Sequence, residues 1–511
     1  MPADLPAPRW GVPELDAREL STRIAGVLDR HPAVGLALGV VRAGGPEFFA
    51  ARGLADVATG RPVADDTVFR VASITKTFTA IAVLQLVEQG LVGLDEPANA
   101  YLRSVQLLHK GEGWRPATVR HLLTHTAGIG EEVTRSALFR PDFGESIAAG
   151  RPVPALADFY RGRVRLAAEP GTRFRYGNHG PALLGQLVED VSRQPLGRYL
   201  REQVFGPLGM TDTDLHPSAE LRSRVATGYR LTRRGIRAVP LREFVTAGAA
   251  GAYSTPRDMA RYVAALLGGG TNGHGTVLEP GSVAEMFAAQ YRPDPRIPGM
   301  GLAFFRGEAG GHAVVEHQGV LPGFDSQIFL APDDGVGVVA FTNGTRQGGF
   351  WLPAETGRLL DDLIGAGHTG IRADVPHHPE IWEDICGLYV LRGPLSDVRI
   401  RAVLGAGMQV LLLRGRPHLR LLSPAGVVTG ALALHPDDPA DPYAFRVDLM
   451  GTGLITPTVV FSQDALGRTT ALHLDLMPIT AVKRSFPGGS RPDQDSTLPV
   501  AAETLALSRP D

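Results

Sequence analysis

The chain has 511 residues and a formal net charge of −2, from 51 Lys plus Arg against 53 Asp plus Glu. This balance excludes a broadly basic surface, so neither nucleic acid nor an anionic membrane is expected as a partner. The hydrophobic content of 44% is ordinary for a globular protein, and the length is sufficient for two or three domains.

Cysteine occurs once, at Cys386, which excludes an internal disulfide and fits a reducing compartment. The N-terminus lacks a basic start followed by an apolar run of signal-peptide length. No window approaches the roughly 18 apolar residues of a membrane span. These features predict a cytoplasmic protein that does not enter the membrane.

The first part of the chain, 1–367, is predicted to form an α+β domain. In chain order, the patterns indicate a helix over 14–30, a β-hairpin over 34–41 and 48–53, and helices over 73–88, 180–191, 196–205 and 256–267. Thr255 is expected to cap the last of these in a capping box with Asp258. Strands over 313–315, 327–330 and 335–342 and a helix over 352–364 follow. Strands at both ends predict one antiparallel sheet shared by the two ends of the domain.

The pattern changes after a Gly- and Pro-containing linker predicted over 368–380. Short alternating runs then recur at intervals typical of a small antiparallel barrel, which is expected over 381–486. The runs cover 398–403, 409–413, 418–422, 427–434, 445–450, 458–461 and 470–476. The polar stretch 487–511 is predicted to be a disordered tail.

The sharpest chemical signal is the pair Ser73 and Lys76 at the start of the predicted helix over 73–88. Residues three apart on a helix share a face, about 5–6 Å between Cβ atoms. A desolvated amine can take the proton of a serine hydroxyl, and backbone N–H groups at a helix N-terminus can stabilise an oxyanion. The spacing alone is common, so other residues have to support it.

Two further motifs follow in order, Tyr176-Gly-Asn178 and His317-Gln-Gly319. In the order Ser-x-x-Lys, Tyr-x-Asn, His-x-Gly, the chain resembles the serine β-lactamase and penicillin-recognising superfamily. The stretches 118–128, 207–213, 249–258, Gly323-Phe324 and 341–343 are similar to its class C and esterase-like branch. The resemblance covers about residues 15–365.

The resemblance implies a role for each motif residue. Ser73 would be the acyl-forming nucleophile, Lys76 would accept or relay its proton, and Tyr176 would be the general base and then the acid toward the leaving group. Asn178 would orient Lys76 and the substrate. His317 and Gly319 would bind substrate from the third-motif strand, and the backbone N–H groups of Ser73 and Val320 would form the oxyanion hole.

One motif departs from the class C pattern, because His317-Gln-Gly319 stands where Lys-Thr-Gly is usual. His-x-Gly resembles D-aminopeptidases, amidases, esterases and peptide-cyclising thioesterases of the fold, so recognition of a substrate carboxylate is not expected. The C-terminal barrel resembles the lipocalin-like domain of some such enzymes. The resemblance implies no cofactor. His121 and His125 have metal-like spacing but no evident third ligand, so no metal is expected.

Three functions therefore stay open. The first is a serine hydrolase of small esters, amides or short peptides, including those with a D-residue. The second is a thioesterase or acyltransferase that cyclises or transfers a peptidyl group. The third is a catalytically idle homologue that binds ligands. A small molecule or short peptide is the expected partner in each, and the sequence does not determine the oligomeric state.

Overall fold

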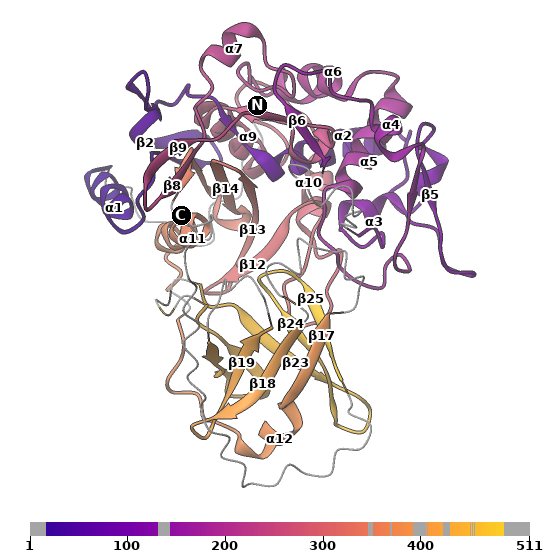
Figure 1. Ribbon diagram of the computed structural model, residues 1–511, viewed down its shortest axis with the longest axis vertical. Helices are drawn as coiled ribbons and strands as arrows, with labels where there is room; N and C mark the ends of the chain where they lie inside the picture. Colours follow the sequence, from indigo (N-terminus) through magenta and orange to yellow (C-terminus); the bar gives the residue numbers. More distant parts are fainter. Residues whose placement is uncertain are drawn as a thin grey trace, which may run out of the picture.

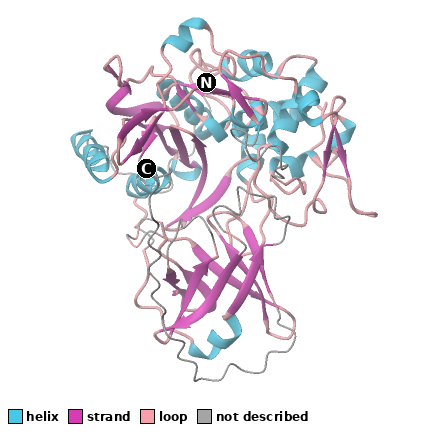
Figure 2. Cartoon of the chain, viewed as in Figure 1, coloured by secondary structure: helices cyan, strands magenta, loops and turns pink. Residues whose placement is uncertain are grey.

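The computed structural model describes residues 17–130, 144–345, 351–367, 370–391, 405, 407–422, 430–449, 451, 453 and 455–484. The predicted strand over 398–403 and the predicted tail over 487–511 lie outside these residues. Figure 1 shows a mixed helix and strand part with a separate group of strands beside it, and Figure 2 shows that this second group contains little helix.

The main sheet has seven antiparallel strands and joins the two ends of the predicted α+β domain. Strand β1 lies between the hairpin partner β2 and the late strand β15, with Leu36 opposite Thr342. The prediction of one shared sheet is confirmed. In spatial order the strands are β12 (Phe305–Ala309), β13 (His312–Leu321), β14 (Phe324–Ala331), β15 (Val336–Thr342), β1 (Gly35–Arg42), β2 (Gly45–Asp56) and β3 (Arg61–Pro62).

Both faces of this sheet are covered, so successive apolar residues of one strand enter different cores. Ala37 and Val41 of β1 lie in the core formed with α2 (Thr75–Glu88) and α9 (Pro256–Leu267). Leu36, Leu38 and Val40 lie in the core formed with α1 (Ala17–Arg30) and α11 (Trp351–Leu363). The continuous apolar run of β1 follows from this two-sided burial.

The helical part is built around α2, which is buried on every side from Thr75 to Leu86. The other helices are α3 (Val119–Leu123), α4 (Leu156–Tyr160), α5 (His179–Ser192), α6 (Leu196–Leu200) with a π-helical turn over Arg201–Phe205, α7 (Ala219–Ser223), α8 (Ala247–Ala250) and α10 (Pro280–Phe287). Short strands pair as β4 (Phe69–Arg70) with β11 (Tyr253–Ser254), β5 (Gln106–Leu108) with β7 (Arg163–Arg165), β6 (Ser146–Ala148) with β10 (Arg242–Phe244), and β8 (Tyr229–Thr232) with β9 (Gly235–Ala238) and β16 (Gly344–Thr345).

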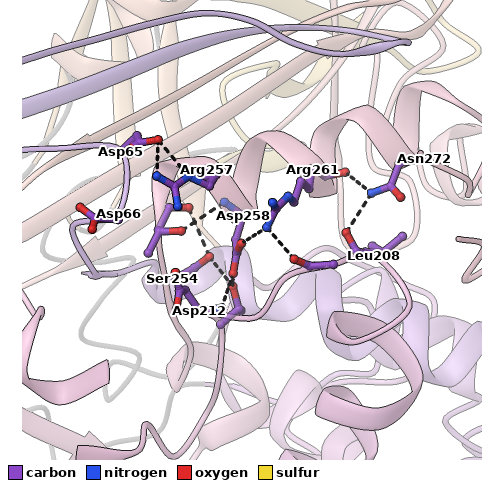
Figure 3. A network of polar contacts seen from close by, with 12 residues as sticks. Asp65, Asp66, Leu208, Asp212, Ser254, Arg257, Asp258, Arg261 and Asn272 are labelled. Atoms are coloured by element: carbon purple, nitrogen blue, oxygen red, sulfur yellow. Dashed lines mark hydrogen bonds and ion pairs between the residues drawn. The ribbon is translucent and has the colours of Figure 1, made fainter. Parts of the chain in front are cut away.

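A polar network at the start of α9 links two of the family-like stretches, 207–213 and 249–258 (Figure 3). Thr255 caps α9 by accepting from the Asp258 N–H, as predicted. The Asp258 side chain, however, accepts from the Asp212 N–H at 2.7 Å and the Thr213 hydroxyl at 2.9 Å. The expected capping box is therefore replaced by a link between α9 and the 207–213 loop, which Arg261 strengthens by bonding to Gly209 O.

The C-terminal strands form a nine-stranded antiparallel sheet that is nearly closed into a barrel. Its two end strands, β20 and β21, are separated by one residue in the sequence. The order is β20 (Ala431–Ala433), β19 (Arg416–Leu421), β18 (Gly407–Leu413), β17 (Gly387–Leu391), β25 (Ile479–Lys483), β24 (Thr469–Leu474), β23 (Thr458–Gln463), β22 (Asp441–Arg446) and β21 (His435–Asp438). A short helix, α12 (Trp382–Ile385), precedes β17.

The loop over 291–300 attaches the main sheet's part of the chain to the barrel. Arg296 bonds to Asp441 at 2.9 Å and to the Phe461 carbonyl at 2.9 Å, both in the barrel. Ile297 packs with Ala444 and Val460. The exact domain boundaries stay a prediction.

No helix in the described part of the chain is long and apolar enough to cross a membrane.

Candidate active site

Lys76 lies at the centre of the candidate site and is 1% exposed. Its Nζ donates to Ser73 Oγ at 2.9 Å, to Asn178 Oδ1 at 2.9 Å and to the Ala249 carbonyl at 3.1 Å. A buried ammonium is costly unless its donors are paired. These contacts pair it and direct one donor at the predicted nucleophile.

Ser73 lies in a 3₁₀ turn over Ala72–Ile74, two residues before the first residue of α2, and not in that helix itself. The residue before it, Ala72, has φ +49°, which is uncommon for a residue with a Cβ. Neighbouring contacts hold the turn: the Val71 carbonyl accepts from Ser326 at 2.9 Å and the Val71 N–H donates to Ala252. Strained backbone of this kind concentrates at functional sites.

Asn178 stands at the N-cap position of α5, yet its side chain does not cap the helix. Its Oδ1 accepts from Lys76, and its Nδ2 donates to Glu145 Oε2 at 2.9 Å. Asparagine is favoured at N-caps because it can bond to the first turn. Here both ends of the amide are used by the site.

Glu145 is a residue of the site that the sequence reasoning missed. It precedes β6, is 2% exposed, and accepts from Asn178 and, at 3.4 Å, from Thr246. No motif surrounds it, and its position next to Asn178 depends on the pairing of β6 with β10. Its burial beside the site is visible only in the fold.

Tyr176 brings its ring against the same cluster. Lys76 Nζ lies 5.0 Å from the ring centroid, and the His125 and His317 rings lie at 4.7 Å and 6.4 Å. Phe305 completes this surround at 5.9 Å. Tyr176 therefore lies beside the Lys76 side chain, with aromatic and imidazole rings around it.

His317 is a neutral, buried imidazole in this site. Desolvation, with the Lys76 charge as a smaller cause, lowers the pKa of His317 to about 3. Its Nδ1 lies 2.7 Å from the Gln318 carbonyl. Because a carbonyl only accepts, Nδ1 carries the proton and Nε2 keeps its lone pair. Nε2 has no hydrogen-bond partner among the residues that the structure describes.

Gly319 lies where β13 passes closest to the Ser73 turn. A Cβ at this position would lie 2.2 Å from the Val71 carbonyl oxygen and 2.3 Å from Ser326 Oγ. Only glycine permits this approach. The next residue, Val320, has a side chain that is 51% exposed. Strand β12 pairs with β13 only as far as Glu316.

His121 and His125 have separate structural roles. His121 Nδ1 accepts from the Thr118 N–H and completes a capping box at α3. His125 has φ +58°, packs on Tyr176 and Phe174, and has a pKa well below its usual value because it is desolvated. Each ring is thus placed by local packing and hydrogen bonding.

The barrel contributes to the surroundings of Tyr176. Ile479 of β25 forms an apolar cluster with Phe174 and Met300. The residues packed against this cluster include Tyr176, Tyr291, Phe305, Leu391 and Met477. One side of Tyr176 is therefore covered by apolar side chains, which come from both the α+β part of the chain and the barrel.

Comparison with known protein families identifies the family to which this fold and site belong. The sequence profile described as Beta-lactamase matches residues 20–360, more than half of the chain. The chain belongs to the β-lactamase family. The match spans the seven-stranded sheet, all six named residues of the three motifs and Glu145, and ends before the barrel.

Curated proteins similar to this chain include two whose names state an activity. Protein Rv1367c of Mycobacterium tuberculosis is 34% identical over 262 residues, covering 46% of this chain and 62% of that protein. Esterase EstB of Burkholderia gladioli is 35% identical over 207 residues, covering 39% and 52%. Acyltransferase calJ of Penicillium decumbens is 30% identical over 254 residues, covering 45% and 58%. The matches thus span less than two thirds of each relative.

A similar solved structure extends the likeness to the C-terminal sheet. The crystal structure of SurE has a TM-score of 0.60 at 23% identity, covering 92% of this chain and 99% of that one. At this identity the likeness concerns the fold. The predicted fold class, an α+β domain followed by a small all-β barrel, is confirmed.

Proposed function

We propose that this protein is a serine hydrolase that forms an acyl-enzyme at Ser73 from a small ester, an amide or a short peptide, including peptides with a D-residue. The observation that carries the proposal is the 2.9 Å hydrogen bond from Lys76 Nζ to Ser73 Oγ. Lys76 is held from two other directions by Asn178 and Ala249, which fixes its donor on the hydroxyl. A nucleophile, a proton carrier and an orienting group in contact are the general signature of covalent catalysis.

Acylation begins with attack of Ser73 Oγ on the substrate carbonyl. The hydroxyl proton passes to the deprotonated Tyr176 oxygen, directly or by a relay in which Lys76 gives Tyr176 one proton as it takes the serine proton, and the carbonyl oxygen becomes an oxyanion. The backbone N–H groups of Ser73 and Val320 are its proposed donors, each worth about 10²–10³ in rate in comparable sites. Collapse of the intermediate breaks the bond to the leaving group, which receives a proton from Tyr176.

Deacylation repeats these steps with water as the nucleophile. Tyr176, with Lys76 beside its ring, takes a proton from the water. That proton is then passed to Ser73 Oγ, directly or through Lys76, so that Ser73 leaves as the hydroxyl and Tyr176 is ready for the next cycle. Every step uses groups of the chain itself. The intact contacts among Ser73, Lys76 and Asn178 argue against a catalytically idle homologue.

The neutral state of His317 supports substrates that lack a carboxylate at the third motif. A carboxylate is bound best by a charged donor. Burial keeps His317 uncharged at neutral pH, and its free Nε2 is an acceptor. Esters, amides and peptides without a free carboxylate at this position are the proposed substrate class.

Replacement of the nucleophile tests the proposal. Ser73→Ala is expected to abolish turnover of activated esters, because no other group in the cluster replaces the hydroxyl. Ser223→Ala, in an exposed position on α7, is the matched control and is expected to keep wild-type turnover. Turnover retained by a folded Ser73→Ala protein would contradict the proposal.

A second candidate is transfer of the acyl group to an amine in place of water, including peptide cyclisation. Its support is the named acyltransferase among the relatives. The two functions differ only in the acceptor that reaches the acyl-enzyme. Product analysis with a peptidyl thioester distinguishes them: a cyclic or amine-linked product supports transfer, and linear acid alone supports hydrolysis.

A further inference from the structure

Glu145 is a buried carboxylate whose position is fixed by backbone and side-chain contacts. Its carbonyl accepts from the Val245 N–H at 2.8 Å, which continues the pairing of β6 and β10. Its Oε2 accepts from Asn178 Nδ2 at 2.9 Å and from the Thr246 hydroxyl at 3.4 Å. Thr246 is itself fully buried. Glu145 therefore reaches the site through Asn178.

The contact determines which way the Asn178 amide faces. An amide has a donor end and an acceptor end of nearly the same shape, and an ionised carboxylate only accepts. Glu145 therefore selects the orientation in which Nδ2 faces Glu145 and Oδ1 faces Lys76. In the opposite orientation, an NH₂ group would face the Lys76 ammonium and an amide oxygen would face the carboxylate.

Charge supports the same arrangement. A buried carboxylate is costly unless it is hydrogen-bonded or paired with a positive group. The Lys76 ammonium lies on the other side of the same amide, so Asn178 bridges a negative and a positive group. The bridge holds Lys76 on the side of Ser73.

We propose that Glu145 is a positioning residue of the reaction at Ser73, which holds the Asn178 amide in the orientation that keeps Lys76 Nζ on Ser73 Oγ. This inference rests on the proposed function, because it concerns the acylation step. Glu145 does not touch the reacting atoms in this arrangement, and its effect on the rate passes through Asn178.

The first test is the rate of acylation by an activated ester, measured by stopped flow on the full chain. Glu145→Gln is expected to slow acylation about 10- to 100-fold with little change in KM, since small misplacements of a catalytic group cost this much. The matched control is Glu243→Gln, which alters another buried carboxylate, on β10, that bonds to Tyr253 and Arg222. It is expected to acylate within about twofold of wild type, as independent sites do.

A double-mutant cycle separates positioning from general stabilisation. If Glu145 acts through Asn178, Glu145→Gln in an Asn178→Ala background is expected to change the acylation rate by less than about twofold. An undiminished loss in that background, or a wild-type rate for Glu145→Gln alone, would overturn the inference.

Exchanging the acid and the amide between positions 145 and 178 gives a further test. Its readout is recovery of activity by a second substitution, so it does not depend on a loss of activity in one variant. Asn178→Asp alone places two carboxylates together and is expected to be slow. Adding Glu145→Gln restores a donor facing an acceptor and leaves a carboxylate oxygen for Lys76, so at least about a tenfold recovery over Asn178→Asp is expected. No recovery in the folded double variant would overturn the inference.

The outcomes for this inference and for the proposed function are distinguishable. Wild-type protein that forms no adduct with a fluorophosphonate would contradict the proposed function. Wild-type protein that forms the adduct, together with Glu145→Gln protein that acylates at the same rate, would contradict the role of Glu145 alone.

Discussion

At the scale of single residues, the candidate site combines charged groups with uncharged imidazoles. His317 and His125 both have a pKa below the usual value, and desolvation is the largest cause for each. The pKa of His317 is about 3 in the folded chain, against a usual imidazole pKa of 6.5. Between about pH 3 and pH 6.5, His317 is therefore protonated in the unfolded chain and neutral in the folded chain.

This difference predicts how stability depends on pH. Because the unfolded state holds more protons, the free energy of unfolding falls as pH drops below about 6.5, by up to about 1.4 kcal/mol per pH unit for one such group. His317→Gln is expected to remove this contribution and to show a shallower acid dependence. Urea unfolding from pH 7 to pH 4 measures it, and parallel curves for the two proteins would contradict the burial of a neutral imidazole.

The nucleophile and its lysine were predictable from the sequence because they are three residues apart and bond within one turn. Asn178 and His317 were predictable from family-like motifs, and the structure places both next to Lys76 or Tyr176. Glu145 was not predictable, because its contact with Asn178 arises from long-range packing between segments with no local pattern. Its chemical role depends on where the fold places it.

At the scale of secondary-structure elements, the site requires β13 to approach the Ser73 turn closely. Gly319→Ala is expected to push β13 away from that turn, because its Cβ would meet the backbone oxygen of Val71 at 2.2 Å. Acylation is expected to fall by about 100-fold or more, as expected for a displaced catalytic group. Steady-state kinetics with an activated ester measures the loss.

The matched control for this prediction is Gly307→Ala on β12. No atom lies within 4 Å of a Cβ built there, so wild-type kinetics and a similar melting temperature are expected. Equal losses in the two variants would show that the close approach at Gly319 has no special importance.

The five central strands of the main sheet were predictable because they are apolar, and the shared sheet follows from strands at both ends, but its edge strands β3 and β12 were missed. In the barrel, β21 and β25 were missed. Strand β21 has the sequence His-Pro-Asp-Asp, which contains no apolar alternation and pairs only because β22 lies beside it. The proposed capping box at Asp258 was wrong because the 207–213 loop supplies other donors to its carboxylate.

At the scale of the whole molecule, the barrel and the β-lactamase-family part share an apolar cluster beside Tyr176. Ile479→Asp is expected to disrupt this contact and to raise KM for bulky acyl esters several-fold, because the charged side chain would need water where Ile479 now packs. Labelling of Ser73 by a small fluorophosphonate is expected to persist, since no catalytic contact is altered.

Leu476→Asp provides the comparison for that prediction. Leu476 is 44% exposed and lies just before Met477 and Ile479, the residues of the apolar cluster, so a charge at Leu476 is expected to leave KM unchanged. Equal effects of the two substitutions, measured with one short and one bulky ester, would contradict a barrel contribution to the substrate site.

The intact mass of the protein after incubation with a fluorophosphonate tests the central claim most directly. The account predicts one adduct on the wild-type chain and none on Ser73→Ala, with both proteins folded. An adduct of equal yield on Ser73→Ala would place the reactive group elsewhere, and no adduct on either protein would contradict an activated serine at this site.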